Sequence, residues 1–223
     1  MEDSPISSTE IKQLLYYMNR IESFEKTFII QRDSVSRLIW GLLLIGAGIL
    51  DGVFSSLHFF GLASITPWIL AIVSGLIIQN FSNRHLIDIY SRQTQDKGTE
   101  SNNLFLIGSF VIMGVAIFFF NMTEMHYLIF PIIALISGFT SIVEDRKYYS
   151  KNEEILNKMA SFVTPIVSFS AAIVMLLGNL IDPEFFLYAG LIFGCTFGSS
   201  FSFVAYWNRR QIDIYIEKID IPE

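Results

Sequence analysis

Six long apolar stretches, none interrupted by a lysine or an arginine, place the strongest constraint on what this chain can fold into. A helix needs about 20 mostly apolar residues to cross about 30 Å of hydrocarbon, because each residue adds about 1.5 Å. With 52% hydrophobic and 16% charged residues, the chain is also too apolar for an ordinary water-soluble domain. We therefore expect an all-α polytopic membrane protein with six transmembrane helices at 38–57, 65–81, 104–120, 127–143, 162–181 and 185–206.

The basic residues indicate how these helices are oriented. All 15 Lys and Arg residues lie before the first stretch, between the second and third, between the fourth and fifth, or after the sixth. The alternate loops contain none: 57–66, 121–126 and 182–184. Because short cytoplasmic loops are enriched in Lys and Arg, we expect three helical hairpins in the cell membrane, with both termini in the cytoplasm. Residues 1–37 would form a cytoplasmic tail and amphipathic helix, and 38–223 the membrane domain.

A repeated motif follows two of the even-numbered stretches. Residues 83–90 read NRHLIDIY and residues 208–215 read NRRQIDIY, with six identities in eight positions. A weaker match, AIVSG at 71–75 and ALISG at 134–138, includes the middle hairpin. Self-similarity at a regular spacing indicates repeated structural units. We therefore predict a three-fold internal repeat, each copy consisting of a span, an outer turn, a second span and a cytoplasmic helix.

Equivalent positions of the repeat carry small residues and basic residues. Small residues permit close approach of membrane helices, so we expect five of them to face the interior of the bundle: Ser74, Gly75, Ser137, Gly138 and Ser199. On the same register, Ser200 is equivalent to the two glycines. The basic residues are expected to form a ring at the cytoplasmic boundary, within reach of lipid phosphate: Arg84, Lys147 and Arg209.

The segment before the first span has the pattern of an amphipathic helix. Ser7 and Glu10 have the spacing of a capping box, which predicts a helix start there. Apolar residues then recur every three or four positions: Ile11, Leu14, Met18, Ile21, Phe24 and Phe28. This stripe can lie on the membrane surface, pack on the protein's own loops or pair with a second copy, and we favour the loops. Cytoplasmic helices are also expected at 152–159 and at the end of the last span.

Asp51 has the strongest physical rationale among the candidate functional residues. It lies 13 residues beyond Leu38, the first residue of the first span. An ionisable side chain inside a bilayer is costly, and its presence suggests a function by default. Asp51 would bind a cation, relay a proton or pair with a polar group, unless the span ends before it and it is an interfacial cap. Gln79 and Asn80 are further candidates, although solvation at the interface also explains them.

Enzyme motifs are missing from the chain. There is no HExxH, no GxSxG, no glycine-rich phosphate loop and no pair of cysteines, and the three histidines are scattered. We therefore expect a non-catalytic protein without a metal, a cofactor or a nucleic-acid partner.

Two functions are compatible with these features. In the first, the chain is an accessory, scaffold or sensor subunit whose cytoplasmic helices bind a protein partner or a second copy. In the second, it is a small transporter or channel with a pathway between the hairpins. The first is favoured because the spans contain few polar residues, whereas the repeated motif lies on the cytoplasmic side.

Overall fold

The computed structural model of the protein describes residues 8–57, 66–78, 112, 115, 119 and 125–220. Of these residues, 94% are helical and none is in a strand. Within them, three helical segments are long and apolar enough to cross a membrane: Gln13–Ser56, Lys158–Ile181 and Pro183–Lys218. A shorter apolar helix covers Thr66–Ile78. The all-helical fold and the association with a membrane agree with the expectation from the sequence.

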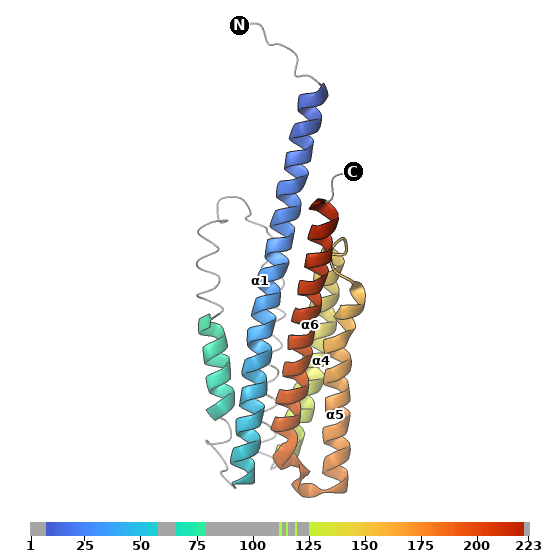
Figure 1. Ribbon diagram of the computed structural model, residues 1–223. Helices are drawn as coiled ribbons and strands as arrows, with labels where there is room; N and C mark the ends of the chain where they lie inside the picture. The colour runs from blue at the N-terminus through green and yellow to red at the C-terminus, as the bar shows by residue number, and fades with distance from the viewer. Residues whose placement is uncertain are drawn as a thin grey trace.

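Helix α1 (Ser8–Ser56) is one uninterrupted helix of 49 residues. At the usual rise per residue it is about 73 Å long. It starts where the capping box predicted and passes residues 37 and 38 without a break, because no glycine or proline interrupts the sequence from Ser8 to Trp40. In Figure 1 its N-terminal part extends beyond α6 at the end of the bundle where α1 begins and α6 ends, the upper end in that view.

This protruding part of α1, residues 13–24, is called the overhang. Seven large apolar or aromatic side chains of the overhang are between 54% and 68% exposed: Leu14, Leu15, Tyr16, Tyr17, Met18, Ile21 and Phe24. The packing expected on the loop between the second and third spans is not tested, because residues 79–111 lie outside the described residues, but no described loop covers this stripe. The reason is geometric, since a straight continuation of α1 carries these residues past the end of the bundle. Contact with the bundle begins at Lys26, which pairs with Glu154 at 3.2 Å, and at the buried Thr27.

Helix α4 (Ile129–Lys151) follows a short 3₁₀ helix, η1 (His126–Leu128). It ends at Asn152, whose backbone N–H and side-chain amide both donate to the carbonyl of Tyr148, at 3.2 and 2.9 Å. The helix expected over 152–159 is not observed, because this cap closes the helix and a turn follows. The turn places Ile155 and Leu156 in the protein interior. A second 3₁₀ helix, η2 (Lys158–Phe162), then leads into α5 (Val163–Ile181).

A tight turn joins α5 to the last helix at the lower end of the bundle. The carboxylate of Asp182 accepts a hydrogen bond of 2.9 Å from the backbone N–H of Glu184, and Pro183 opens the 3₁₀ helix η3 (Pro183–Tyr188). Asp182 is the N-cap of η3, and Pro183 needs no backbone donor at that position. Helix α6 (Ala189–Asp220) then continues without interruption through the repeated motif at 208–215, as predicted.

Glycines mediate the contact between α1 and α6, which is the most extensive contact between two helices in the described part of the chain. A Cβ atom at Gly198 would lie 2.5 Å from the carbonyl oxygen of Gly41. A Cβ atom at Gly194 would lie 2.5 Å from the carbonyl oxygen of Leu44 and 2.6 Å from the Cα of Gly48. The two backbones therefore approach each other closely, as small residues allow in membrane helix pairs.

Two hydrophobic clusters fill the remaining helix interfaces. The upper cluster includes Ile30 of α1, Tyr149 of α4 and Ile212 of α6. The lower cluster is made of small and flexible side chains of α4, α5 and α6: Ala134, Ala171, Ala172, Met175, Ala189 and Phe193. Helix Thr66–Ile78 lies beside α1 (Figure 1), and a Cβ atom at its Gly75 would meet the ring of Trp40.

Candidate functional site

A polar cluster lies between α1, α4 and α6 in the upper half of the bundle, and consists of Arg37, Asp145, Tyr148, Tyr149 and Asn208. A guanidinium nitrogen of Arg37 donates to a carboxylate oxygen of Asp145 at 2.6 Å. Their side chains are only 18% and 6% exposed, so this is a largely buried ion pair. The same guanidinium lies 5.2 Å from the centre of the Tyr148 ring, within the range of a cation–π contact.

Tyr149 and Asn208 extend the cluster from α4 to α6. The hydroxyl of Tyr149 donates to the side-chain oxygen of Asn208 at 2.8 Å, and both residues are fully buried. Asn208 opens the motif NRRQIDIY, and Ile212 of the same motif is also buried, whereas Arg209 and Asp213 are exposed. Asn208 and Ile212, which are four residues apart, thus form the inward face of the motif and hold α6 against α4.

Burial controls the acid–base behaviour of the acids and tyrosines on this part of α4. Desolvation raises the pKa of Asp145, and the nearby Arg37 opposes the rise. Burial likewise raises the pKa of Glu144, with a smaller contribution from the negative charge of Asp145. It also raises the pKa of Tyr149 to about 12, so this phenol remains a hydrogen-bond donor at neutral pH. Arg37 is permanently charged, and its contacts with the Asp145 carboxylate and the Tyr148 ring hold α1 against α4.

Two buried groups of the cluster have donor capacity that the described residues do not use. The amide nitrogen of Asn208 and the hydroxyl of Tyr148 make no hydrogen bond within the described part of the chain. Buried polar atoms normally find a partner, because leaving one unpaired costs about 1–3 kcal/mol. The cluster can therefore donate further hydrogen bonds without losing the ones it has.

Asp51 lies in the lower half of the bundle, on α1, and is 4% exposed. Its carboxylate contacts Gly190 at the start of α6, where a Cβ atom would collide with it. Trp68 of helix Thr66–Ile78 is its polar neighbour. The Trp68 ring packs with Phe130 and Phe193, at centroid distances of 5.4 and 5.7 Å. Since α1 continues to Ser56, Asp51 does not cap the helix and is enclosed by aromatic side chains from three other helices.

The remaining predicted site residues are only partly described. Gln79, Asn80 and Arg84 lie outside the described residues, so neither a shared site with Asp51 nor the basic ring is tested by the structure. Lys147 and Arg209, the other two members of the ring, are both exposed.

The small residues of the repeat divide into two sets. Gly75, Gly138 and Ser200 are all buried, as expected for one equivalent position facing the interior. In the serine set, Ser137 is buried and Ser74 is half-buried, but Ser199 is exposed. The interior position expected for Ser199 is therefore not observed. The reason is that Gly198 of α6 faces α1. The next residue, Ser199, is rotated by about 100° around the helix axis and so points away from that contact.

Sequence reasoning missed the polar cluster. Arg37 is only one of the basic residues that indicate orientation, and no motif singles out Asp145. Asn208 could have indicated the cluster. Both copies of the repeated motif begin with an asparagine, whereas two of the later positions differ. No protein family, curated protein or solved structure matches this chain.

Proposed function

We propose that this chain is a non-catalytic, multi-pass protein of the cell membrane that acts as an accessory, scaffold or sensor subunit through its cytoplasmic helices. In this proposal the six apolar stretches form three hairpins and both termini are cytoplasmic. The absence of basic residues from alternate loops supports this orientation. The overhang of α1 is the single observation that carries the function.

The overhang exposes its apolar side chains where no part of the described bundle covers them. Leu14, Met18 and Ile21 recur along one side of the helix at intervals of four and three residues. Soluble surfaces rarely expose contiguous apolar patches beyond a few hundred Å², and larger ones usually mark interaction sites. Amphipathic helices commonly bind partners through anchors at this spacing. The overhang therefore has the character of a protein-binding helix.

The continuity of α1 argues against the membrane surface as the partner of the overhang. The overhang and the apolar stretch 38–57 belong to one unbroken helix. If that stretch crosses the bilayer, the overhang projects away from the membrane along the same axis. The ion pair between Lys26 and Glu154 and the burial of Ile30 hold α1 to the bundle just below the overhang. Among occupants from outside this chain, a protein partner or a second copy remains for this surface.

Site-specific photo-crosslinking in native membranes tests the proposal. A photoreactive amino acid at Met18 should give a discrete adduct, either with one partner protein or with a second copy. Ile21→Gln on the same background should reduce that adduct strongly, because it removes the neighbouring anchor, which is 68% exposed.

A matched control comes from the exposed end of α6. Ile214 and Ile216 are 45% and 43% exposed. A photoreactive amino acid at Ile214, with and without Ile216→Gln, therefore tests whether any exposed apolar helix surface gives an adduct. The proposal requires an adduct from Met18 that the control position does not give. Equal crosslinking from both positions, or none from Met18, would overturn it.

A small transporter or channel is the second candidate function, and Asp51 is the observation in its favour. A buried carboxylate in a helix suited to cross a membrane is the kind of group that carries protons or cations in transporters. Asp51→Asn preserves the size of the side chain while it removes the charge. In this candidate, the variant loses proton- or cation-coupled flux in reconstituted vesicles while its thermal unfolding midpoint stays close to wild type. An unchanged flux, or a variant that only loses stability, would exclude the transport role.

A further inference from the structure

Large apolar residues recur at every seventh position along most of α1. Because α1 is continuous from Ser8 to Ser56, the overhang and the apolar stretch 38–57 share one helical register. The series starts in the overhang and ends two residues before Asp51: Leu14, Ile21, Phe28, Val35, Leu42 and Ile49. Phe28 is half-buried, and the other five are between 48% and 68% exposed. An apolar repeat of seven residues that is sustained along a helix is the pattern of a coiled coil.

A second set of positions, three residues after members of this series, strengthens the pattern. Tyr17, Phe24 and Leu38 are 60%, 68% and 41% exposed. The series and these three residues are called the seam. The alternating spacing of three and four residues holds from Leu14 to Phe28 and again from Val35 to Leu42. The other positions of the second set are a glutamine and two residues that pack on α6: Gln31, Ile45 and Gly52.

The seam lies on a side of α1 that its described neighbours leave open. Gly41 faces α6, because a Cβ atom there would collide with the carbonyl of Gly198. Trp40 faces Gly75 of helix Thr66–Ile78. Leu42 is rotated around the helix axis by about 100° from Gly41 and by about 200° from Trp40. It therefore points away from both contacts, in agreement with its exposure of 59%.

The length of the seam favours a second copy of this chain over a soluble partner. The overhang alone covers fewer than two heptads, and a soluble partner would meet only that part. In the proposed topology, a second copy in the same membrane has the same orientation, so its α1 runs parallel at the same height. Two identical seams then match position by position along the overhang and along the apolar stretch 38–57. Two-fold pairing of one surface with itself is the commonest symmetry of homo-oligomers.

Charges beside the seam suit this parallel arrangement. With Leu14 and Ile21 at heptad position a, Arg20 is at position g and Glu25 is at position e. In a parallel coiled coil, a residue at g lies beside the e residue of the next heptad in the other helix. Arg20 of each copy thus faces Glu25 of the other copy, and no residue of the seam is charged. These two contacts favour the parallel register, whereas the apolar seam supplies most of the affinity.

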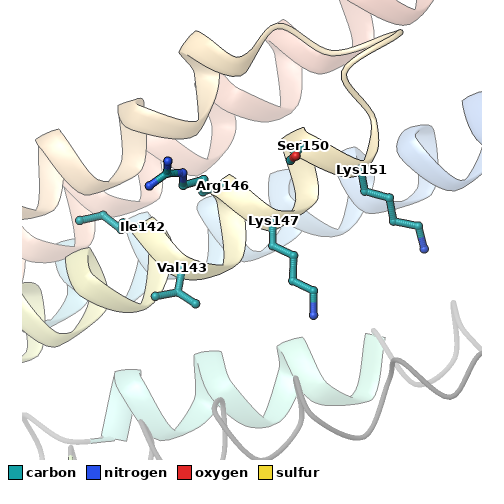
Figure 2. Close-up of a pocket in the computed structure, with 6 residues that line it drawn as sticks. All are labelled: Ile142, Val143, Arg146, Lys147, Ser150 and Lys151. Carbon is teal, nitrogen blue, oxygen red and sulfur yellow. The ribbon is translucent and has the colours of Figure 1, made fainter.

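The outer face of α4 carries a shallow groove but offers no comparable contact. Figure 2 shows Arg146 directed away from Lys147 and Lys151, so these cations do not converge on one ligand. Lys147 and Lys151 also interact with other groups of this chain. The seam of α1 is the longer and more uniform surface.

We propose that two copies of this chain pair through the seam of α1, as parallel helices related by a two-fold axis along the membrane normal. The pairing names the partner of the overhang and therefore rests on the proposed function. A straight helix drifts by about 20° per heptad relative to a seven-residue repeat. The two α1 helices therefore cross with the slight left-handed supercoil of a coiled coil.

Disulfide crosslinking in native membranes tests this pairing. On a Cys195→Ser background, which removes the cysteine of the natural sequence, a single cysteine is placed at Ile21 or at Leu42. Oxidation with copper phenanthroline should give a covalent homodimer from each position. The first position reports on the overhang and the second on the apolar stretch 38–57.

Two control positions distinguish the seam from random collision. Ser23 is rotated by about 200° from Ile21 and lies on the opposite side of the overhang. Ile173 of α5 is 55% exposed but belongs to another helix. Cysteines at these two positions should give little or no dimer under the same oxidation.

Co-purification of two differently tagged copies measures the strength of the pairing. The double variant L14Q/I21Q should lower the recovery of the second copy by roughly tenfold or more, because each copy loses two apolar anchors. I214Q/I216Q removes two exposed apolar side chains from α6, outside the seam, and should leave the recovery unchanged.

Three results would overturn the pairing. Equal dimer from the seam and from the control positions would show collision only. A photo-adduct from Met18 with a different protein, without any homodimer, would exclude the second copy and leave the proposed function intact. Neither a homodimer nor a foreign adduct would refute both, as expected if residues 79–111 of the same chain cover the overhang.

Discussion

At the scale of single residues, the ion pair between Arg37 and Asp145 joins two helices that are far apart in the sequence. Removing one member of a buried pair leaves the other charge without compensation, which typically costs about 3 kcal/mol or more. We therefore expect Asp145→Asn to lower the thermal unfolding midpoint of the purified protein clearly. The double variant R37Q/D145N should recover most of this loss, because it leaves no unpaired charge in the interior.

The exposed pair of Lys158 and Glu153 is the control for this experiment. Their side chains are 62% and 55% exposed, and such pairs contribute at most about 1 kcal/mol. Lys158→Gln should leave the midpoint nearly unchanged. A loss in Asp145→Asn that is no larger than the loss in Lys158→Gln would contradict the assigned role of the buried pair.

Glu144 gives a pH-dependent prediction on the same turn of α4. Because burial raises its pKa in the folded state, the folded protein binds this proton more tightly than the unfolded chain does. The resulting stabilisation is complete below the ordinary glutamate pKa of about 4.3 and is lost as the pH rises through the raised value. Glu144→Gln should therefore have a higher unfolding midpoint than wild type at pH 8, and the difference should shrink as the pH falls. A difference that does not vary with pH would rule out the titration of Glu144 as its cause.

At the scale of elements, the glycine contact between α1 and α6 is the interface most sensitive to small changes. A methyl group at Gly198 would meet the backbone of α1, which cannot move aside without separating the helices. Overpacking of this kind usually costs about 1–3 kcal/mol. We expect Gly198→Ala to lower the midpoint of unfolding in a detergent titration.

Gly46 on α1 provides the matched control, because a Cβ atom there would have nothing within 4 Å. Alanine favours a helix over glycine by about 1 kcal/mol, so Gly46→Ala should leave stability unchanged or raise it. If both substitutions destabilise the protein equally, close packing of α1 on α6 is not what the glycines provide.

Elements within one stretch of sequence were easier to predict than contacts between stretches. The start of α1 and the continuation of α6 depend on neighbouring residues, and both agree with the sequence analysis. The turn after Lys151 does not, because Ile155 and Leu156 are drawn into a cluster built from α1, α4 and α6. The pairing of Arg37 with Asp145 likewise joins residues 108 positions apart, and no local pattern encodes that distance.

At the scale of the whole molecule, the polar cluster and the overhang share one end of the bundle. Asp51 lies toward the other end, enclosed by Trp68, Phe130 and neighbouring groups. The ion pair between Arg37 and Asp145 joins α1, the helix that also carries the overhang, to α4. A partner on the overhang would therefore act on a helix that a buried ion pair holds against α4.

The orientation of the whole chain is open to a direct test by cysteine labelling. On a Cys195→Ser background, a membrane-impermeant maleimide should label a cysteine at Glu184 in intact cells, because this turn joins the lower ends of α5 and α6. Cysteines at Ser150 and Ser91 should react only after permeabilisation, since both follow even-numbered apolar stretches that return the chain to the side rich in Lys and Arg. With the N-terminus in the cytoplasm, position 91 is cytoplasmic when the stretches 38–57 and 65–81 both cross the membrane, and it is external when only one of them does. Labelling at position 91 in intact cells would exclude the arrangement of three hairpins. If position 91 is protected and position 184 is labelled, the chain must cross the membrane an odd number of times between these two positions.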